Sequence, residues 1–127
     1  MNYQCTYCNK IIKKPPTPVW LCDCGKPLYT HYEWEGILRN LLVDEKNESL
    51  WRYASVLPKK CLKEKISLGE GWTPLLHISK NVYVKNEIVN PTGSFKDRGM
   101  SMAITMAKIQ NVKKICLPSA GNAGVSA

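Results

Sequence analysis

Lys96 is the residue whose chemistry stands out most, because it lies where a helix is predicted to begin. Asn90–Gly93 has the composition of a turn, and the apolar pattern after it predicts a helix from about Phe95 to Gln110. Lys96 and Arg98 then fall in the first turn, where the helix dipole disfavours cations by about 0.3–1 kcal/mol. This field favours the neutral amine, which is the form that attacks a carbonyl carbon. Lys96 is therefore a candidate for a covalent bond to an aldehyde, although ordinary surface cations would fit the same local pattern.

A second candidate segment is the small-residue loop Ser119–Gly124, which precedes another predicted helix start. Backbone N–H groups at such a position bind anions readily. Gly121 and Gly124 allow a close approach to the backbone, and Asn122 supplies an amide that can hydrogen-bond a ring oxygen or a carboxylate. The loop taken alone is equally well explained as a plain turn.

The elements around these two loops alternate in type. Val82–Lys85 is predicted to be a strand, the helix after the first loop to be largely buried, and Lys114–Pro118 to be the next strand, with a further helix beginning at Val125–Ala127. This order predicts an α/β fold, the start of a doubly wound parallel sheet. Ligands bind beyond the carboxyl ends of such strands, so both loops are expected at one sheet edge.

The composition changes near residue 35, which predicts a small module at 1–35 and the beginning of a second, incomplete domain at 36–127. Ile37–Leu42 and Leu50–Leu57 are predicted to form short helices, and Ser67–Pro74 a loop rich in Gly and Pro.

Four of the six cysteines lie in the first module, as Cys5-x-x-Cys8 and Cys22-x-Cys24. Two such thiol pairs, with residues 9–21 between them, can close a tetrahedral zinc site of ribbon type. Cys-x-Cys is less usual than Cys-x-x-Cys, and four reduced thiols in a degenerate ribbon are the alternative. His31 is expected on the surface of a strand over Leu28–Tyr32. Cys61 and Cys116 are expected to be structural, with Cys116 in a buried strand.

The bulk properties fit a globular protein with an anionic partner or a solvated basic surface. The chain of 127 residues has a formal net charge of +8, with 44% hydrophobic and 22% charged residues. It has neither an apolar run long enough for a membrane nor a secretory signal pattern, so a cytoplasmic location with reduced thiols is expected. A nucleic-acid-binding zinc ribbon would explain the cysteines and the charge, but not the two loops.

Three segments together resemble a known enzyme family. Asn90–Gly99 resembles the cofactor-lysine segment of the fold-type II pyridoxal phosphate enzymes, and Ser119–Gly124 resembles the loop that follows it. Leu68–Leu75 resembles the segment that precedes both in threonine synthases. The resemblance extends from about Leu50 to the end, and some threonine synthases carry a similar small ribbon ahead of the catalytic domain.

The resemblance implies a set of roles. Lys96 would hold pyridoxal 5'-phosphate and later act as the acid–base group, and Asn122 would hydrogen-bond the ring hydroxyl of the cofactor. The substrate α-carboxylate would be bound by Ser119, Ala120, Gly121, Asn122 and Ala123, with Lys85, Asn90 and Thr92 as weaker candidates near the site. The reaction would convert O-phosphohomoserine, a phosphorylated amino acid, and water to threonine and phosphate.

The resemblance leaves alternatives open. Threonine dehydratase, cysteine synthase and cysteate synthase share the lysine and the asparagine loop. In such chains the glycine-rich loop for the cofactor phosphate and the group facing the pyridine nitrogen come later. We therefore expect the sequence to be an N-terminal fragment without substantial activity of its own, and the full-length enzyme to be a homo-oligomer.

Overall fold

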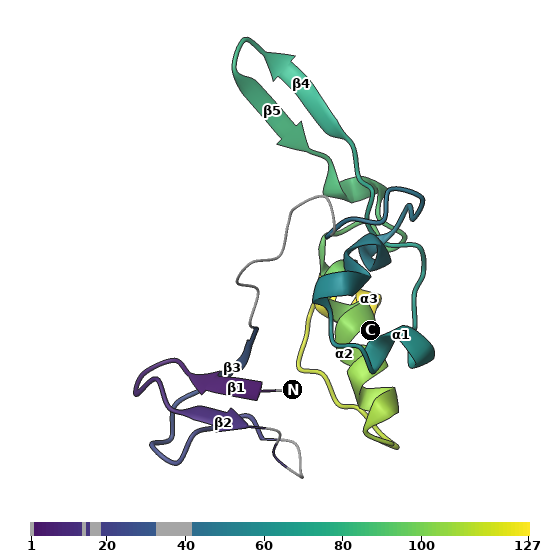
Figure 1. Cartoon of the computed structure of the whole chain (residues 1–127). Helices are drawn as coiled ribbons and strands as arrows, with labels where there is room; N and C mark the ends of the chain where they lie inside the picture. Colours follow the sequence, from purple (N-terminus) through teal and green to yellow (C-terminus); the bar gives the residue numbers. More distant parts are fainter. Residues whose placement is uncertain (1, 14, 16–18, 33–41) are drawn as a thin grey trace. The chain divides into compact units, whose positions relative to one another are not determined.

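The computed structural model describes residues 2–13, 15, 19–32 and 42–127 (Figure 1). The chain divides into two compact units, Met1–Ile37 and Leu38–Ala127. Most of the helix predicted over Ile37–Leu42 falls outside the described residues. Within the described part of the chain, no helix has the length and apolar character needed to cross a membrane.

The first unit is a small antiparallel sheet. Its strands are β1 (Asn2–Cys5), β2 (Ile11–Lys13) and β3 (Leu28–His31), in the order β2-β1-β3. Asn2 pairs with Lys13 on one side of β1 and with His31 on the other. The strand predicted from Leu28 is thus confirmed. Both cysteine pairs lie in or beside the turns of this sheet, which is too small to bury an apolar core of its own.

The second unit is built around helix α2 (Lys96–Ile109), which confirms the helix predicted after the turn. Its fully buried side chains are polar, namely Asp97, Ser101 and Thr105, whereas its methionines and isoleucines are only partly covered. The prediction of a largely buried apolar helix is therefore only partly right. Burial of the polar stripe is possible because its hydroxyls bind the chain at Ile66: Ser101 donates to the Ile66 carbonyl at 2.7 Å, and Thr105 accepts from the Ile66 N–H at 2.9 Å.

Short helices complete this unit. The 3₁₀ helix η2 (Leu50–Val56) confirms the helical prediction there and places the Trp51 ring in the core, 2% exposed. The single-turn helix α1 (Cys61–Glu64) packs on α2, with the Cys61 thiol directed at the sulfur atoms of two α2 methionines. The 3₁₀ helix η3 (Glu87–Val89) precedes the turn that leads into α2. Helix α3 (Asn122–Ser126) lies beside the beginning of α2.

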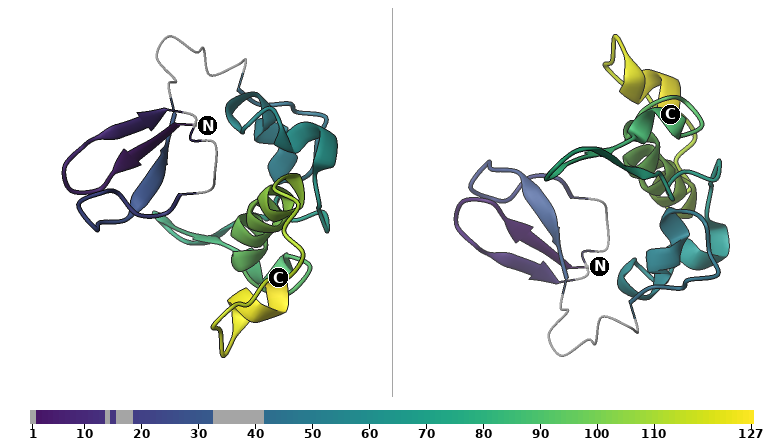
Figure 2. Two further views of the ribbon diagram at one scale, coloured as in Figure 1. Left: turned by 90° about the horizontal axis from the view of Figure 1, so that it is seen from below. Right: turned by 90° about the horizontal axis from the view of Figure 1, so that it is seen from above.

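The strand predicted at Val82–Lys85 is present as β5, but its partner is not the predicted one. It pairs antiparallel with β4 (Leu75–Ser79), a strand that the sequence pattern had not indicated. The hairpin projects from the helices of its unit, and every residue of both strands is exposed (Figure 2).

The second predicted strand, Lys114–Pro118, is not formed. These residues are exposed and carry no strand pairing, and Cys116 is exposed instead of buried. The described residues therefore contain no parallel strand pair, and the predicted parallel pairing is wrong for this structure. The physical reason is that a strand needs a neighbour for its backbone hydrogen bonds, and no described strand pairs with Lys114–Pro118.

Candidate functional site

The start of α2 is set by a tight turn and by one carboxylate. Gly93 has φ +80° and donates its N–H to the Asn90 carbonyl at 2.8 Å, which closes the turn. Asp97 lies three residues after Ser94, the spacing of a capping box, but the helix start has no side-chain cap hydrogen bond. The Asp97 carboxylate instead accepts from the backbone N–H of Thr92 at 2.8 Å and from the Thr92 hydroxyl. The Asp97 side chain therefore holds the turn against the helix it enters.

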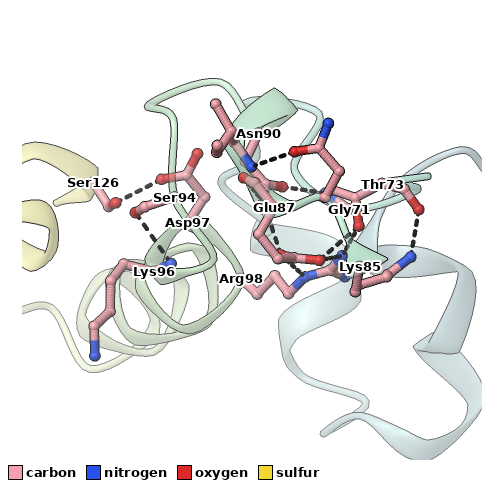
Figure 3. Close-up of polar contacts among 12 residues, drawn as sticks. Gly71, Thr73, Lys85, Glu87, Asn90, Ser94, Lys96, Asp97, Arg98 and Ser126 are labelled. Carbon is pink, nitrogen blue, oxygen red and sulfur yellow. Dashed lines mark hydrogen bonds and ion pairs between the residues drawn. The ribbon is translucent and has the colours of Figure 1, made fainter. Parts of the chain in front are cut away.

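The same carboxylate joins α3 to this turn. Ser126, in the last turn of α3, donates its hydroxyl to Asp97 at 2.5 Å, and its oxygen lies 2.9 Å from the Thr92 hydroxyl. Burial acts to raise the pKa of the Asp97 carboxyl, but these hydrogen bonds outweigh burial and lower it below the usual value. The turn before α2 and the segment after the small-residue loop thus meet at Asp97 (Figure 3).

Lys96 is the first residue of α2 and is half-buried. Its backbone N–H lies 3.3 Å from the Ser94 hydroxyl, and its amine lies 4.7 Å from the centroid of the Phe95 ring. Among the described residues, no carboxylate pairs with this amine. Figure 3 shows the side chain directed away from the polar network around Arg98. The Lys96 amine is therefore available to a ligand.

The loop before α3 is exposed and locally ordered. The Ser119 hydroxyl accepts from the N–H groups of Gly121 and Gly124, at 3.2 and 3.1 Å. Asn122 begins α3, and its exposed side-chain amide has no partner within the described parts of the chain. Side-chain contact between Asn122 and Lys96 is not among the interactions of the structure, and their joint role stays a prediction.

A second polar network lies on the other side of the α2 start, and the sequence did not indicate it. Arg98 binds the Glu87 carboxylate with two nearly parallel hydrogen bonds, Nε to Oε2 at 2.8 Å and Nη2 to Oε1 at 2.9 Å. Thr73 donates to Glu87 at 2.6 Å, and Asn90 donates to it at 2.8 Å. The Arg98 guanidinium lowers the pKa of the Glu87 carboxyl to about 2, although burial opposes the shift.

Two of the weaker candidates serve this network structurally. The side-chain oxygen of Asn90 accepts the Gly71 N–H at 3.0 Å, and its side-chain NH2 donates to the backbone carbonyl of Glu87 in η3. Asn90 therefore bridges two segments of the chain. The Lys85 amine donates to the backbone carbonyl of Thr73. Thr92, the third, is bound to Asp97 as described. In this structure all three hold protein groups together.

The four N-terminal cysteines converge on one point. Their sulfur atoms all lie within 4.8 Å of one another, with 3.6 Å between Cys5 and Cys24, 3.7 Å between Cys8 and Cys22 and 3.8 Å between Cys8 and Cys24. A tetrahedron of sulfur atoms around Zn²⁺, at about 2.3 Å each, has edges of about 3.8 Å. The arrangement thus has the dimensions of a four-thiolate zinc site.

The two turns supply the backbone that such a site requires. The N–H groups of Tyr7 and Cys8 each point to the Cys5 sulfur at 3.4 Å, and the Cys8 N–H chiefly lowers the pKa of the Cys5 thiol to about 6. In the second turn Gly25, with φ +77°, donates to the Cys22 carbonyl at 2.8 Å. The shorter Cys-x-Cys spacing is accommodated by this positive φ. His31 takes no part, since its ring lies 3.2 Å from the Gln4 side chain.

Known proteins resemble this chain over most of its length. The family model described as "Pyridoxal-phosphate dependent enzyme" matches residues 66–127. The chain is 36% identical to a threonine synthase of Methanocaldococcus jannaschii over 99% of its own length and 34% of the relative. It is 38% identical to a threonine synthase of Methanosarcina acetivorans, over 95% of the chain and 32% of the relative. For a threonine synthase of Bacillus sp. the identity is 48%, over 61% of the chain and 24% of the relative.

The chain thus spans about a third of the length of the first two of these curated relatives. Comparison with the solved structures gave no significant match.

Proposed function

Because residues 66–127 of this chain belong to the pyridoxal-phosphate-dependent enzyme family, we propose that the protein carries the cofactor lysine of a threonine synthase and that Lys96 is this lysine. The observation that carries the proposal is the position of the Lys96 amine and its lack of an ion pair. Lys96 stands at the first position of α2, has no carboxylate partner in the described structure, and belongs to a turn fixed by Asp97. An amine that no carboxylate holds in an ion pair is free to approach an aldehyde carbon.

The roles proposed for the chain's own residues follow from this placement. Lys96 would hold the cofactor covalently and, once released from it, would move protons at the substrate carbon atoms. Asn122, exposed and without a side-chain partner among the residues that the structure describes, would donate its amide to the ring hydroxyl. Residues 119–123 would bind the α-carboxylate of the substrate, which we propose to be O-phosphohomoserine. Pyridoxal phosphate, when bound, supplies an electron sink for charge that develops on substrate carbon.

Reductive trapping tests the lysine assignment directly. The purified protein is incubated with pyridoxal phosphate, reduced with borohydride, digested and analysed by mass spectrometry. We expect the pyridoxyl group on Lys96 and its loss in Lys96→Ala. Lys113→Ala is the matched control, since Lys113 is an exposed lysine outside both sites, and it should leave labelling unchanged. Equal labelling of many lysines, with no preference for Lys96, would contradict the proposal.

Product analysis separates threonine synthase from its relatives in the same family. Threonine and phosphate formed from O-phosphohomoserine indicate the proposed reaction, whereas release of ammonia from threonine indicates a dehydratase, and formation of cysteine or cysteate indicates the corresponding synthases. Since the chain spans about a third of the first curated relatives, we make this assay secondary to the lysine trapping, which needs only the residues present in this chain.

We further propose that Cys5, Cys8, Cys22 and Cys24 bind one structural zinc ion. The support is the match between the sulfur–sulfur distances of 3.6–3.8 Å and the edge of a zinc–sulfur tetrahedron. The small sheet has little apolar core, so a metal would contribute much of the stability of this unit.

Metal analysis tests this second proposal. We expect about one zinc per chain, loss of the metal in Cys24→Ser, and retention in the control Cys116→Ser, whose thiol is exposed and lies outside the cluster. Chelation should unfold the β1–β3 sheet while the signals of α2 persist. Zinc content far below one per chain, after purification without chelators, would refute the assignment.

A further inference from the structure

Beside the Glu87–Arg98 network lies a pocket of about 340 Å³ that the proposed cofactor site does not use. The charged and aromatic side chains that line it are those of Arg52 and Tyr53 of η2, Trp72 of the loop before β4, Lys85 of β5, Glu87 of η3 and Arg98 of α2. The Lys96 side chain points away from Lys85, Glu87 and Arg98 (Figure 3). A volume of this size accommodates a small molecule.

The charges that line this pocket do not balance. Glu87, its carboxylate, is fully engaged, because both of its oxygens accept hydrogen bonds from Arg98 and one more each from Thr73 and Asn90. Arg52 and Lys85 form no ion pair in the described part of the chain. With Arg98 neutralised by Glu87, the pocket retains two positive charges and offers no free carboxylate.

The Arg52 side chain is held in place by an aromatic ring but lacks a hydrogen-bond acceptor. Its guanidinium carbon lies 4.1 Å from the centroid of the Trp72 ring, so an aromatic face, and not an anion, fixes its position. Its Nε is buried and has no hydrogen-bond partner among the described residues. The terminal N–H groups of Arg52 also bind no acceptor among the described residues, and Arg52 lines the pocket, so its guanidinium is open to an anionic ligand.

The backbone is arranged to keep Trp72 against Arg52. Trp72 has φ +49°, an uncommon value for a bulky residue, and the preceding Gly71 has φ +111°. A side chain at position 71 would meet the Leu50 nitrogen at 2.6 Å, so the loop lies directly on the start of η2. The aromatic face and the cation are therefore presented together by two segments packed on one another.

We propose that this pocket binds a phosphate group, as inorganic phosphate or as the monoester of a small metabolite. A phosphate group carries a charge of about −1.5 to −2 at neutral pH and several strong acceptor oxygens, which match the two unpaired cations of the pocket. A monocarboxylate would leave one cation unbalanced. The site is separate from Lys96, and it neither requires nor excludes the cofactor role of that lysine.

Calorimetric titration of the purified protein tests the proposal, with inorganic phosphate, glycerol 3-phosphate and acetate as ligands at constant ionic strength. We expect saturable binding of phosphate at one site and weaker binding of acetate. Arg52→Gln and Lys85→Gln should each weaken phosphate binding by about tenfold, the usual effect of removing one charged hydrogen-bond donor. Tighter binding of glycerol 3-phosphate than of phosphate would assign the site to a monoester, and the reverse order would assign it to the free ion.

Two controls keep the outcome decisive. Lys113→Gln removes the same charge at an exposed position outside the pocket and should leave binding unchanged. Lys96→Ala should also retain binding, and a loss in this variant would show that the phosphate goes to the proposed cofactor site instead. If circular dichroism shows that Arg52→Gln does not fold, Lys85→Gln carries the test. Absence of saturable binding, or binding unaffected by both pocket variants, would overturn the proposal.

Discussion

Replacement of Glu87 by Gln gives the sharpest test of the polar network at the α2 start. The wild-type carboxylate receives two hydrogen bonds from Arg98, and its pKa falls from 4.5 to about 2. Since one pKa unit corresponds to about 1.4 kcal/mol, the ionised carboxylate contributes about 3 kcal/mol at neutral pH. The side chains of Arg98 and Glu87 are 27% and 23% exposed, so solvent screening reduces this figure only moderately.

The sign of the effect fixes its pH dependence. Because the folded-state pKa of Glu87 is lowered, its contribution is fully present above the unfolded value near 4.5 and is lost as the pH falls towards 2. The difference in unfolding free energy between wild type and Glu87→Gln should therefore be about 3 kcal/mol at pH 7, about 1 kcal/mol at pH 3 and below about 0.5 kcal/mol at pH 2.

Urea unfolding followed by tryptophan fluorescence measures this difference, since Trp51 is buried in the same unit. Glu45→Gln is the control, because Glu45 is exposed and forms no ion pair among the described residues, and its difference from wild type should stay near zero at every pH. A Glu87→Gln effect that is independent of pH between 7 and 2, or that is below about 0.5 kcal/mol at pH 7, would refute the assignment of the stabilisation to the ionised carboxylate.

Three further substitutions test the packing that positions the site. Gly71→Ala combines a positive φ with a Cβ placed 2.6 Å from a backbone nitrogen and should lower the free energy of unfolding by more than about 2 kcal/mol in thermal unfolding. Its control is Gly69→Ala, which has φ +85° but open space around the added Cβ and should cost about 1 kcal/mol. Equal effects of the two substitutions would disprove the close approach at Gly71. Thr105→Val removes, from a fully buried side chain, the hydroxyl that accepts the Ile66 N–H at 2.9 Å. The change should cost about 1–3 kcal/mol in urea unfolding, and an effect near zero would show that water replaces the hydroxyl. Asp97→Asn removes the charge that holds Thr92 and α3, so hydrogen exchange should accelerate in 122–126 well before α2 opens; unchanged exchange there would mean that α3 is anchored by other contacts.

Several features could be predicted from the sequence because they depend on neighbours along the chain. The turn at Asn90–Gly93 and the apolar pattern after it are local, and the helix predicted from about Phe95 is found at Lys96–Ile109. The β5 strand and the two turns that carry the cysteine pairs are local in the same sense. Side-chain periodicity and turn composition act over a few residues, and these are the distances that a sequence pattern reports.

Other features were decided only by the tertiary structure. Hydropathy could not reveal that β5 would pair with β4 in a hairpin instead of with Lys114–Pro118, because both pairings satisfy the strand pattern of Val82–Lys85. The polar stripe of α2 is buried because the Ile66 backbone supplies hydrogen bonds to its hydroxyls, and these partners cannot be read from the pattern of a single helix.

The position of the candidate lysine was thus determined by the sequence alone, whereas its surroundings were not. Glu87 and Arg98 lie eleven residues apart, and Arg52 and Trp72 are further apart still, with no periodicity that links either pair. Their contacts exist because η2, η3 and the loop before β4 fold onto one end of α2. Long-range pairs of this kind are selected by shape and charge in three dimensions, and that selection leaves no pattern of spacing in the chain.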